Sequence, residues 1–600
     1  MKLSVNYGKN DAKLYVQETI RKGDKITSKT IKCLGYLSDL KKIYPDPISH
    51  FREELKKENQ LRRDESKLNN VVSLSFDTSK RINYNEEVSF LGGHLFLEKI
   101  YYELSLDKLT YQLGSDKNYQ FSLNKILANL IYTTILFPRS KLASYELSKK
   151  YIEPINYQIH DVYRALDILS NNIDKIQAHL YKRSSEIIKR KTNILYYDCT
   201  NYFFEIDKED ELKEFGVSKE HRPNPIVQMG LFMDATGLPL AFNINPGSTN
   251  EQVTLQPLEE QIRKDFDLSE FIVCTDAGLA SFDNKVYNSA KTRGFICTQS
   301  IKKSKEYIQQ WVLDKNGWSY TDKDGNLFEN ITLPGEDDEV DENITYFKSR
   351  WVNDEGNTKI NYNGKEMRKK ESIDQRYIVT YSVKYKKYQR TIRENQIERA
   401  KIKLNNPSNI EKKKATSPDR LINRATTTDN GEIAKNNEYS LNIEQIEKEQ
   451  QYDGFYCVAS NIYSGSSKEN EIIDIKKILS ANHNRWEIED CFRIMKSEFK
   501  ARPVYLQREN RIKAHFLINF ISLLVFKILK KRLNNKYTNT EIIECLRDFR
   551  YHKHLDTGDY IPSFVRTELT DKLQDTIKNV IDYQLISKGK MKEILRKIKE

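Results

Sequence analysis

Cysteine is scarce in this sequence. The seven cysteines, at positions 33, 199, 274, 297, 457, 491 and 545, are scattered over 600 residues, and none belongs to a C-x-x-C pair. Zinc fingers and disulfide frameworks need paired cysteines at short or regular spacings. The sequence therefore favours neither, and it fits a reducing compartment.

Long apolar runs are also few. The most apolar stretch, Phe516–Leu529, is interrupted by Asn519 and Lys527 and is too short to cross a bilayer, so we expect a buried helix there. Residues Met1–Lys9 are polar and lack the apolar core of a signal peptide. We expect a cytoplasmic protein without a membrane partner.

Positive charge, in contrast, is in excess. The formal net charge is +12, which suits a polyanion; nucleic acid is favoured, although an anionic membrane or a soluble basic surface would show the same balance. Val383–Ala415 alone holds eleven Lys and Arg against three Glu. Tyr385 and Tyr388 lie among them, as in segments that combine phosphate contacts with base stacking. The alternative is an exposed charged helix followed by a loop.

Two apolar runs each end in an aspartate. Ile194–Tyr197 leads into Asp198, and Phe271–Thr275 leads into Asp276, which small residues follow. A carboxylate just past a buried strand is held by the sheet and still reaches solvent. A single aspartate of this kind is more often a turn or cap residue, but two of them suggest a shared site.

A third acid lies on an amphipathic helix predicted over Asn484–Lys500. At 100° per residue Arg485, Glu489 and Lys496 fall within about 40° of one another. The adjoining face is apolar and consists of Ile488, Cys491, Phe492, Met495 and Phe499. An isolated helix of this type would more often carry a surface Arg–Glu pair over an ordinary core stripe.

Three carboxylates without His or Cys partners favour Mg²⁺ or Mn²⁺ over zinc. Two such ions about 4 Å apart can activate water or a 3′-hydroxyl and stabilise the leaving oxygen of a phosphodiester. The pattern therefore predicts metal-assisted phosphoryl transfer with two ions in the active site.

The sequence also resembles the DDE transposases of bacterial insertion sequences, of the IS4-like superfamily and most closely its IS1634 branch. Arg485, Glu489 and Lys496 match three positions of that family's Tyr-x2-Arg-x3-Glu-x6-Lys signature, while Asn482 replaces the tyrosine. Further similar blocks are Tyr197–Glu205, Ser218–Leu240, Thr275–Ser281 and Arg502–Phe520. The resemblance covers most of the chain and is weak over the first 90 residues.

The resemblance implies roles for individual residues. Asp198, Asp276 and Glu489 would be the catalytic metal ligands, Arg485 and Lys496 would contact DNA phosphate, and Trp486 would stack on a flipped base. For Trp486 simple packing is the alternative. Glu487, Asp490 and Glu498 lie close to Glu489, which the register of the signature selects.

The fold expected is α/β, with an RNase H-like catalytic core whose mixed five-stranded sheet is interrupted by a large β-containing insertion and preceded by a mainly helical region. Strands are predicted at Ile194–Cys199, Ile226–Met233, Leu238–Asn245, Phe271–Thr275 and Phe295–Thr298. The predicted divisions are a small β unit and charged linker (1–85), a helical DNA-end-binding domain (86–190), the core in two parts (191–298 and 476–530), the insertion (299–475) and a C-terminal helical region for dimerisation (531–600).

These observations predict a DNA transposase that binds terminal inverted repeats and performs cut-and-paste cleavage and strand transfer. Its partners would be double-stranded DNA of the element ends and target, and a second copy of the chain in the synaptic complex. It would work in the bacterial cytoplasm, associated with the nucleoid when bound to DNA. The alternatives are a catalytically inactive DNA-binding remnant and a metal-dependent nuclease without strand transfer.

Overall fold

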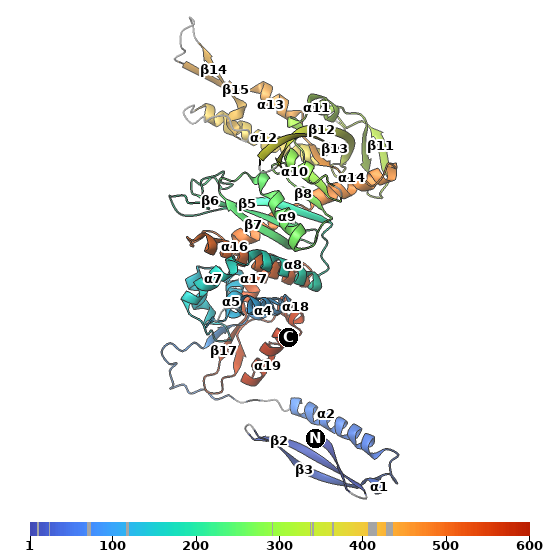
Figure 1. Cartoon of the computed structure of the whole chain (residues 1–600), viewed down its shortest axis with the longest axis vertical. Coiled ribbons are helices and arrows are strands. Elements are labelled where there is room, and N and C mark those ends of the chain that lie inside the picture. Colours follow the sequence, from blue (N-terminus) through green and yellow to red (C-terminus); the bar gives the residue numbers. More distant parts are fainter. Residues whose placement is uncertain are drawn as a thin grey trace. The chain divides into compact units, whose positions relative to one another are not determined.

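The computed structural model describes all residues except 9–10, 23–24, 69–71, 73, 116–118, 291, 336–337, 339–340, 363–364, 406–416 and 428–435. It contains two compact units, Met1–Glu86 and Glu87–Glu600 (Figure 1). Of the basic segment predicted at Val383–Ala415, the final part therefore lies outside the described residues.

The first unit is an antiparallel sheet with a helix. Strands β1 (Lys2–Tyr7), β2 (Ala12–Lys22) and β3 (Lys25–Tyr36) pair in sequence order and are followed by α1 (Leu37–Leu40) and α2 (Pro47–Leu68). The Asn59 side chain of α2 donates to the Met1 carbonyl at 2.8 Å. These strands lie in the span predicted as a small β unit, and α2, which buries Leu55, occupies part of the span predicted as a charged linker.

The second unit opens with a helical layer that the 3.6-residue spacing predicted. A short strand, β4 (Ser89–Leu91), precedes it. The helices are α3 (His94–Glu103), α4 (Leu106–Gly114), α5 (Leu123–Leu136), α6 (Lys141–Ser148), α7 (Ile159–Ser170) and α8 (Ile173–Ile187).

The C-terminal elements pack against this layer. They are α16 (Glu509–Arg532), α17 (Asn539–Asp548), β17 (Arg550–Lys553), β18 (Tyr560–Pro562), α18 (Glu568–Ile577) and α19 (Lys588–Lys599). Helix α16 is long and apolar enough to cross a membrane, but 89% of its most apolar window is buried inside the protein, against α5 and α7 among others. The buried helix expected at Phe516–Leu529 is confirmed.

The five predicted strands are all present and form one end of a larger sheet. They are β5 (Ile194–Phe203), β6 (Ile226–Asp234), β7 (Pro239–Pro246), β8 (Ile272–Thr275) and β9 (Gly294–Thr298). Their spatial order is β7-β6-β5-β8-β9, with β5, β8 and β9 parallel to one another. Helix α9 (Leu255–Asp265) precedes β8, and α10 (Phe282–Tyr287) connects β8 to β9.

The sheet has ten strands rather than the five predicted, because strands of the inserted segment pair onto its β9 edge. The added strands are β16 (Phe455–Ser460), β13 (Lys365–Tyr381), β12 (Tyr346–Tyr362), β10 (Trp318–Thr321) and β11 (Leu327–Ile331), in that spatial order from β9. In register, Val458 of β16 lies opposite Thr298 of β9. The inserted strands thus continue the sheet that carries Asp198 (Figure 1).

The remaining inserted elements lie around this extension. They are α11 (Glu306–Leu313), α12 (Val383–Leu404), the hairpin β14 (Ile422–Thr427) and β15 (Asn436–Leu441), and α13 (Ile443–Gln450). The insertion is followed by α14 (Lys468–His483) and α15 (Trp486–Arg493), and a π-helical turn, η5 (Ile494–Glu498), continues α15.

Candidate active site

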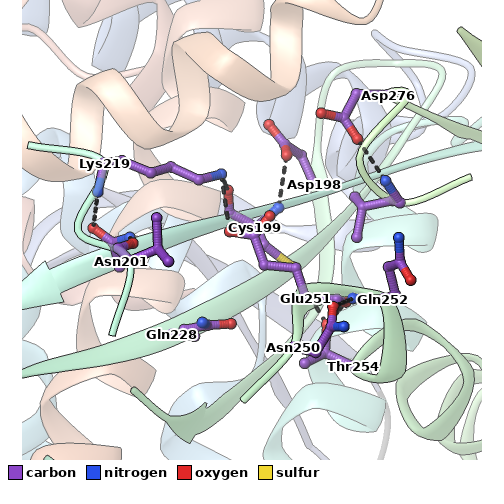
Figure 2. Close-up of polar contacts among 12 residues, drawn as sticks. Asp198, Cys199, Asn201, Lys219, Gln228, Asn250, Glu251, Gln252, Thr254 and Asp276 are labelled. Carbon is purple, nitrogen blue, oxygen red and sulfur yellow. Dashed lines mark hydrogen bonds and ion pairs between the residues drawn. The ribbon is translucent and has the colours of Figure 1, made fainter. Parts of the chain in front are cut away.

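The two aspartates lie on neighbouring interior strands of the sheet, Asp198 within β5 and Asp276 directly after β8. Strands β5 and β8 are parallel, and Tyr196 lies opposite Cys274; the same register continued by two residues places Asp198 opposite Asp276. Figure 2 shows both carboxylates on the same side of β5. Backbone pairing of two strands therefore brings these predicted residues together.

The local hydrogen bonds of the two aspartates differ. An oxygen of Asp198 accepts from the backbone N–H of Cys199 at 2.7 Å, and Asp276 accepts from the N–H of Leu279 at 3.0 Å. Burial raises the pKa of Asp198 to about 6; the charge of Lys219 opposes this rise and that of Asp276 adds to it. A like-charged neighbour at a buried carboxylate favours occupation by a proton or another cation.

Lys219 is a site residue that the sequence analysis did not single out. Its ammonium donates to the Cys199 carbonyl at 2.5 Å and pairs with Glu251 at 3.2 Å. Burial disfavours its charged form, but Asp198 and Glu251 outweigh burial and raise the pKa of Lys219. Lys219 lies in the block Ser218–Leu240 that resembles the transposase pattern, and this resemblance could have indicated the residue from the sequence.

The third predicted acid does not join the aspartates in this structure. The side chain of Glu489 is 60% exposed, and its oxygen lies 3.9 Å from Arg485. The guanidinium of Arg485 acts electrostatically on Asp198, and its buried Nε has no hydrogen-bond partner. Arg485 therefore interacts electrostatically with both Glu489 and Asp198.

The helix predicted over Asn484–Lys500 is not uniform. It begins as α15 and becomes π-helical at η5, where the Phe499 N–H donates to the Ile494 carbonyl at 3.0 Å. A π turn holds more residues than an α turn, so the 100° wheel fails across it. Lys496 is only 15% exposed, whereas Glu489 is 60% exposed, so the two side chains have different surroundings.

Lys496 points toward the aspartate side of the site instead. It lies 5.4 Å from the ring centroid of Tyr202 and 3.3 Å from Glu220, and burial lowers its pKa to about 8. Glu220 also pairs with Arg502. Glu220 was another residue missed from sequence, because its partners are distant in the chain.

Two further predicted positions flank the helix. Trp486 is 54% exposed and so has a free face. Asn482, which replaces the signature tyrosine, donates at 3.0 Å to the hydroxyl of Tyr456 from β16. A tyrosine therefore does lie at this position in space, although it comes from the insertion.

The donor set fits a hard divalent cation in part. Asp198 and Asp276 supply carboxylate oxygens, the ligand atoms that such a cation prefers. Within the described part of the chain, no three His, Cys, Asp or Glu side chains lie close enough to hold a metal ion. The free chain thus presents a two-carboxylate half-site.

Comparison with known proteins gives the family. No curated protein matches the sequence. A solved structure described as a cryo-EM structure of the piggyBac transposase synaptic complex with hairpin DNA is similar at 10% identity, covering 89% of this chain and 80% of that chain with a TM-score of 0.31; a similarity this low supports no conclusion. The family model described as "Transposase DDE domain" matches residues 218–525, a span that holds Asp276 and Glu489 and begins after Asp198. Because this span is more than half of the 600 residues, the chain belongs to the transposase DDE domain family.

Proposed function

We propose that this chain is the DNA transposase of a bacterial insertion sequence, which binds terminal inverted repeats and performs metal-dependent, cut-and-paste cleavage and strand transfer. The observation that carries this proposal is the proximity of Asp198, in β5, to Asp276, directly after the parallel strand β8, in a chain of the transposase DDE domain family. The net charge of +12 suits the DNA partner.

The finer family and fold assignments are part of the proposal. The order β7-β6-β5-β8-β9, with one antiparallel hairpin side and three parallel strands, supports an RNase H-like core. The match of Arg485, Glu489 and Lys496 to the family signature supports the IS4-like superfamily and its IS1634 branch. The aspartates would then sit on the first and fourth core strands.

Two Mg²⁺ or Mn²⁺ ions would be held by Asp198, Asp276 and Glu489. When bound, they supply an activated hydroxyl nucleophile and stabilise the leaving oxygen. The chain's own residues position the substrate: Lys496 and Arg485 hold DNA phosphate beside the carboxylates, and Trp486 offers its exposed ring to an unstacked base.

The remaining regions would support this chemistry. The helices of residues 86–190 would bind the element ends, the basic helix α12 would contact phosphate, and the C-terminal region would help to form the synaptic homodimer. Helix α19 already buries Met591, Ile594 and Ile598 within its own unit, so a dimer contact there would use its charged face. The protein would act on the nucleoid in the cytoplasm.

Two alternatives rest on one observation, the separation of Glu489 from the aspartates. An inactive DNA-binding remnant would keep this separation with DNA bound, and a nuclease would cut without joining.

One experiment distinguishes the transposase, the remnant and the nuclease. In it the full chain is incubated with Mn²⁺, a labelled duplex of the DNA flanking its gene, and a target plasmid. We expect cleavage and joined products from the parent and neither from Asp198→Asn. Binding without cleavage would establish the remnant, and cleavage without joined products the nuclease.

A further inference from the structure

A cavity of about 600 Å³ lies where the helical layer meets the segment after η5. Its lining includes four cations, Arg139, Lys141, Lys500 and Arg502, and two tyrosines, Tyr163 and Tyr505. None of the described residues that line it is acidic. The lining therefore gathers positive charge, and the one ion pair that reaches it among the residues that the structure describes, between Arg502 and Glu220, has its acid outside the lining.

Lys141, in the first turn of α6, is 7% exposed. No hydrogen bond or ion pair connects its ammonium to any described residue, and burial lowers its pKa to about 8. Its neighbour His515 is neutral, because burial and the charge of Lys141 lower the pKa of the imidazole to about 3. A buried, unpaired ammonium destabilises the free protein, and a neutral side chain of the same shape would be preferred on grounds of stability alone.

Lys500 also reduces the stability of the free protein, because of its backbone conformation. It follows the end of η5 with φ of +44°. This left-handed conformation after a helix is the position that glycine normally occupies, because a Cβ is disfavoured there. Lys141 and Lys500 thus each reduce the stability of the free protein, for independent reasons, and both line the same cavity.

We propose that this cavity binds one nucleotide of the DNA strand that occupies the active site. Lys141, Lys500 and Arg139 hold its phosphate, and Tyr505, which is 70% exposed, stacks on its base. This inference rests on the proposed function, since the ligand is the transposase's DNA.

The cavity is connected to the catalytic residues by a chain of ion pairs. Arg502 lines the cavity and pairs with Glu220, and Glu220 pairs with Lys496, whose charge acts on Asp198. A strand that passes from the aspartates toward the cavity follows this line of cations. Glu220 holds the cations in place without entering the cavity itself.

The test is duplex binding by the full chain, measured by fluorescence anisotropy with the DNA that flanks its gene. Lys141→Met should weaken binding about tenfold at 0.1 M salt and reduce the salt slope by about one, as expected for one lost phosphate contact. The same variant should raise the Tm, because it removes an unpaired buried charge. Lys500→Gly should show the same pair of effects. Lys264→Met, an equal charge change at an exposed position of α9, is the matched control and should change neither quantity.

Tighter or unchanged binding by Lys141→Met, or an equal loss in Lys264→Met, would overturn the cavity proposal while cleavage by the parent still upheld the transposase. Displacement of the duplex by about 10 mM inorganic phosphate at constant ionic strength would assign the cavity to free phosphate instead. A parent that binds no duplex would overturn the proposed function and this inference together.

Discussion

The strands β5 and β8 and the helix α15 with η5 carry acids of the same candidate site, but they position them by different means. Asp198 and Asp276 are adjacent because backbone hydrogen bonds set the register of two buried parallel strands. Glu489 extends from a helix surface with a 60% exposed side chain. The sheet therefore positions Asp198 and Asp276 before any ligand binds, whereas Glu489 on the helix surface can still move toward them when the site assembles.

The largest expected effect comes from releasing α15 from the core. Lys527 of α16 donates to Asp490 of α15 at 2.9 Å, and both side chains are less than 10% exposed. Lys527→Met leaves the buried Asp490 carboxylate with only the exposed Arg493 as an ionic partner and should cost about 3 kcal/mol of unfolding free energy in urea titrations. It should abolish cleavage but keep Mn²⁺ binding by the aspartate pair.

The matched control for that variant is Lys513→Met on the same helix. Lys513 pairs with Glu509 on the surface, where both side chains are at least 36% exposed, so its loss should cost less than about 1 kcal/mol. Equal losses in the two variants would show that the buried pair does not hold α15.

A smaller effect should come from the aspartate pair itself. The folded pKa of Asp198, about 6, lies above its ordinary value, so the native state binds more protons and stability should fall as pH rises from about 4 to 6. Asp198→Asn should remove about 1 kcal/mol of this loss in metal-free chemical denaturation. It should also abolish stabilisation by Mn²⁺.

Asp207→Asn, at an exposed acid beyond the same strand, is the control. It should leave both the pH dependence and the Mn²⁺ effect as in the parent. If the free energy of unfolding depends on pH in the same way in the parent and in Asp198→Asn, the raised pKa of Asp198 is refuted.

The smallest effect on stability is expected for Glu489→Gln. Because the side chain is 60% exposed, the free energy of unfolding should change by less than about 0.5 kcal/mol, as measured by thermal unfolding. DNA cleavage should nevertheless be lost, since the acid would act only in the assembled site. Glu498→Gln is its control, and loss of cleavage in that variant alone would reassign the third acid.

How far the sequence predicts this structure depends on the range of the interactions. The apolar runs predicted both strands and the 3.6-residue spacing predicted most helices, but only Asp276 lies just past its strand, whereas Asp198 lies inside β5. The π turn at η5 could not be predicted, since it depends on how α15 packs and not on the local pattern. The same holds for the pairing of β16 with β9 and of Glu220 with Arg502, which join residues far apart in the chain.

The measurement that tests the account most directly is Mn²⁺ binding to the full chain, followed by electron paramagnetic resonance with and without the flanking duplex. The account predicts that Asp198→Asn loses Mn²⁺ binding in both conditions, while Glu489→Gln binds like the parent without DNA and more weakly than the parent with it. Equal binding by parent and Glu489→Gln in the presence of DNA would contradict the account, because Glu489 would then take no part in the assembled metal site.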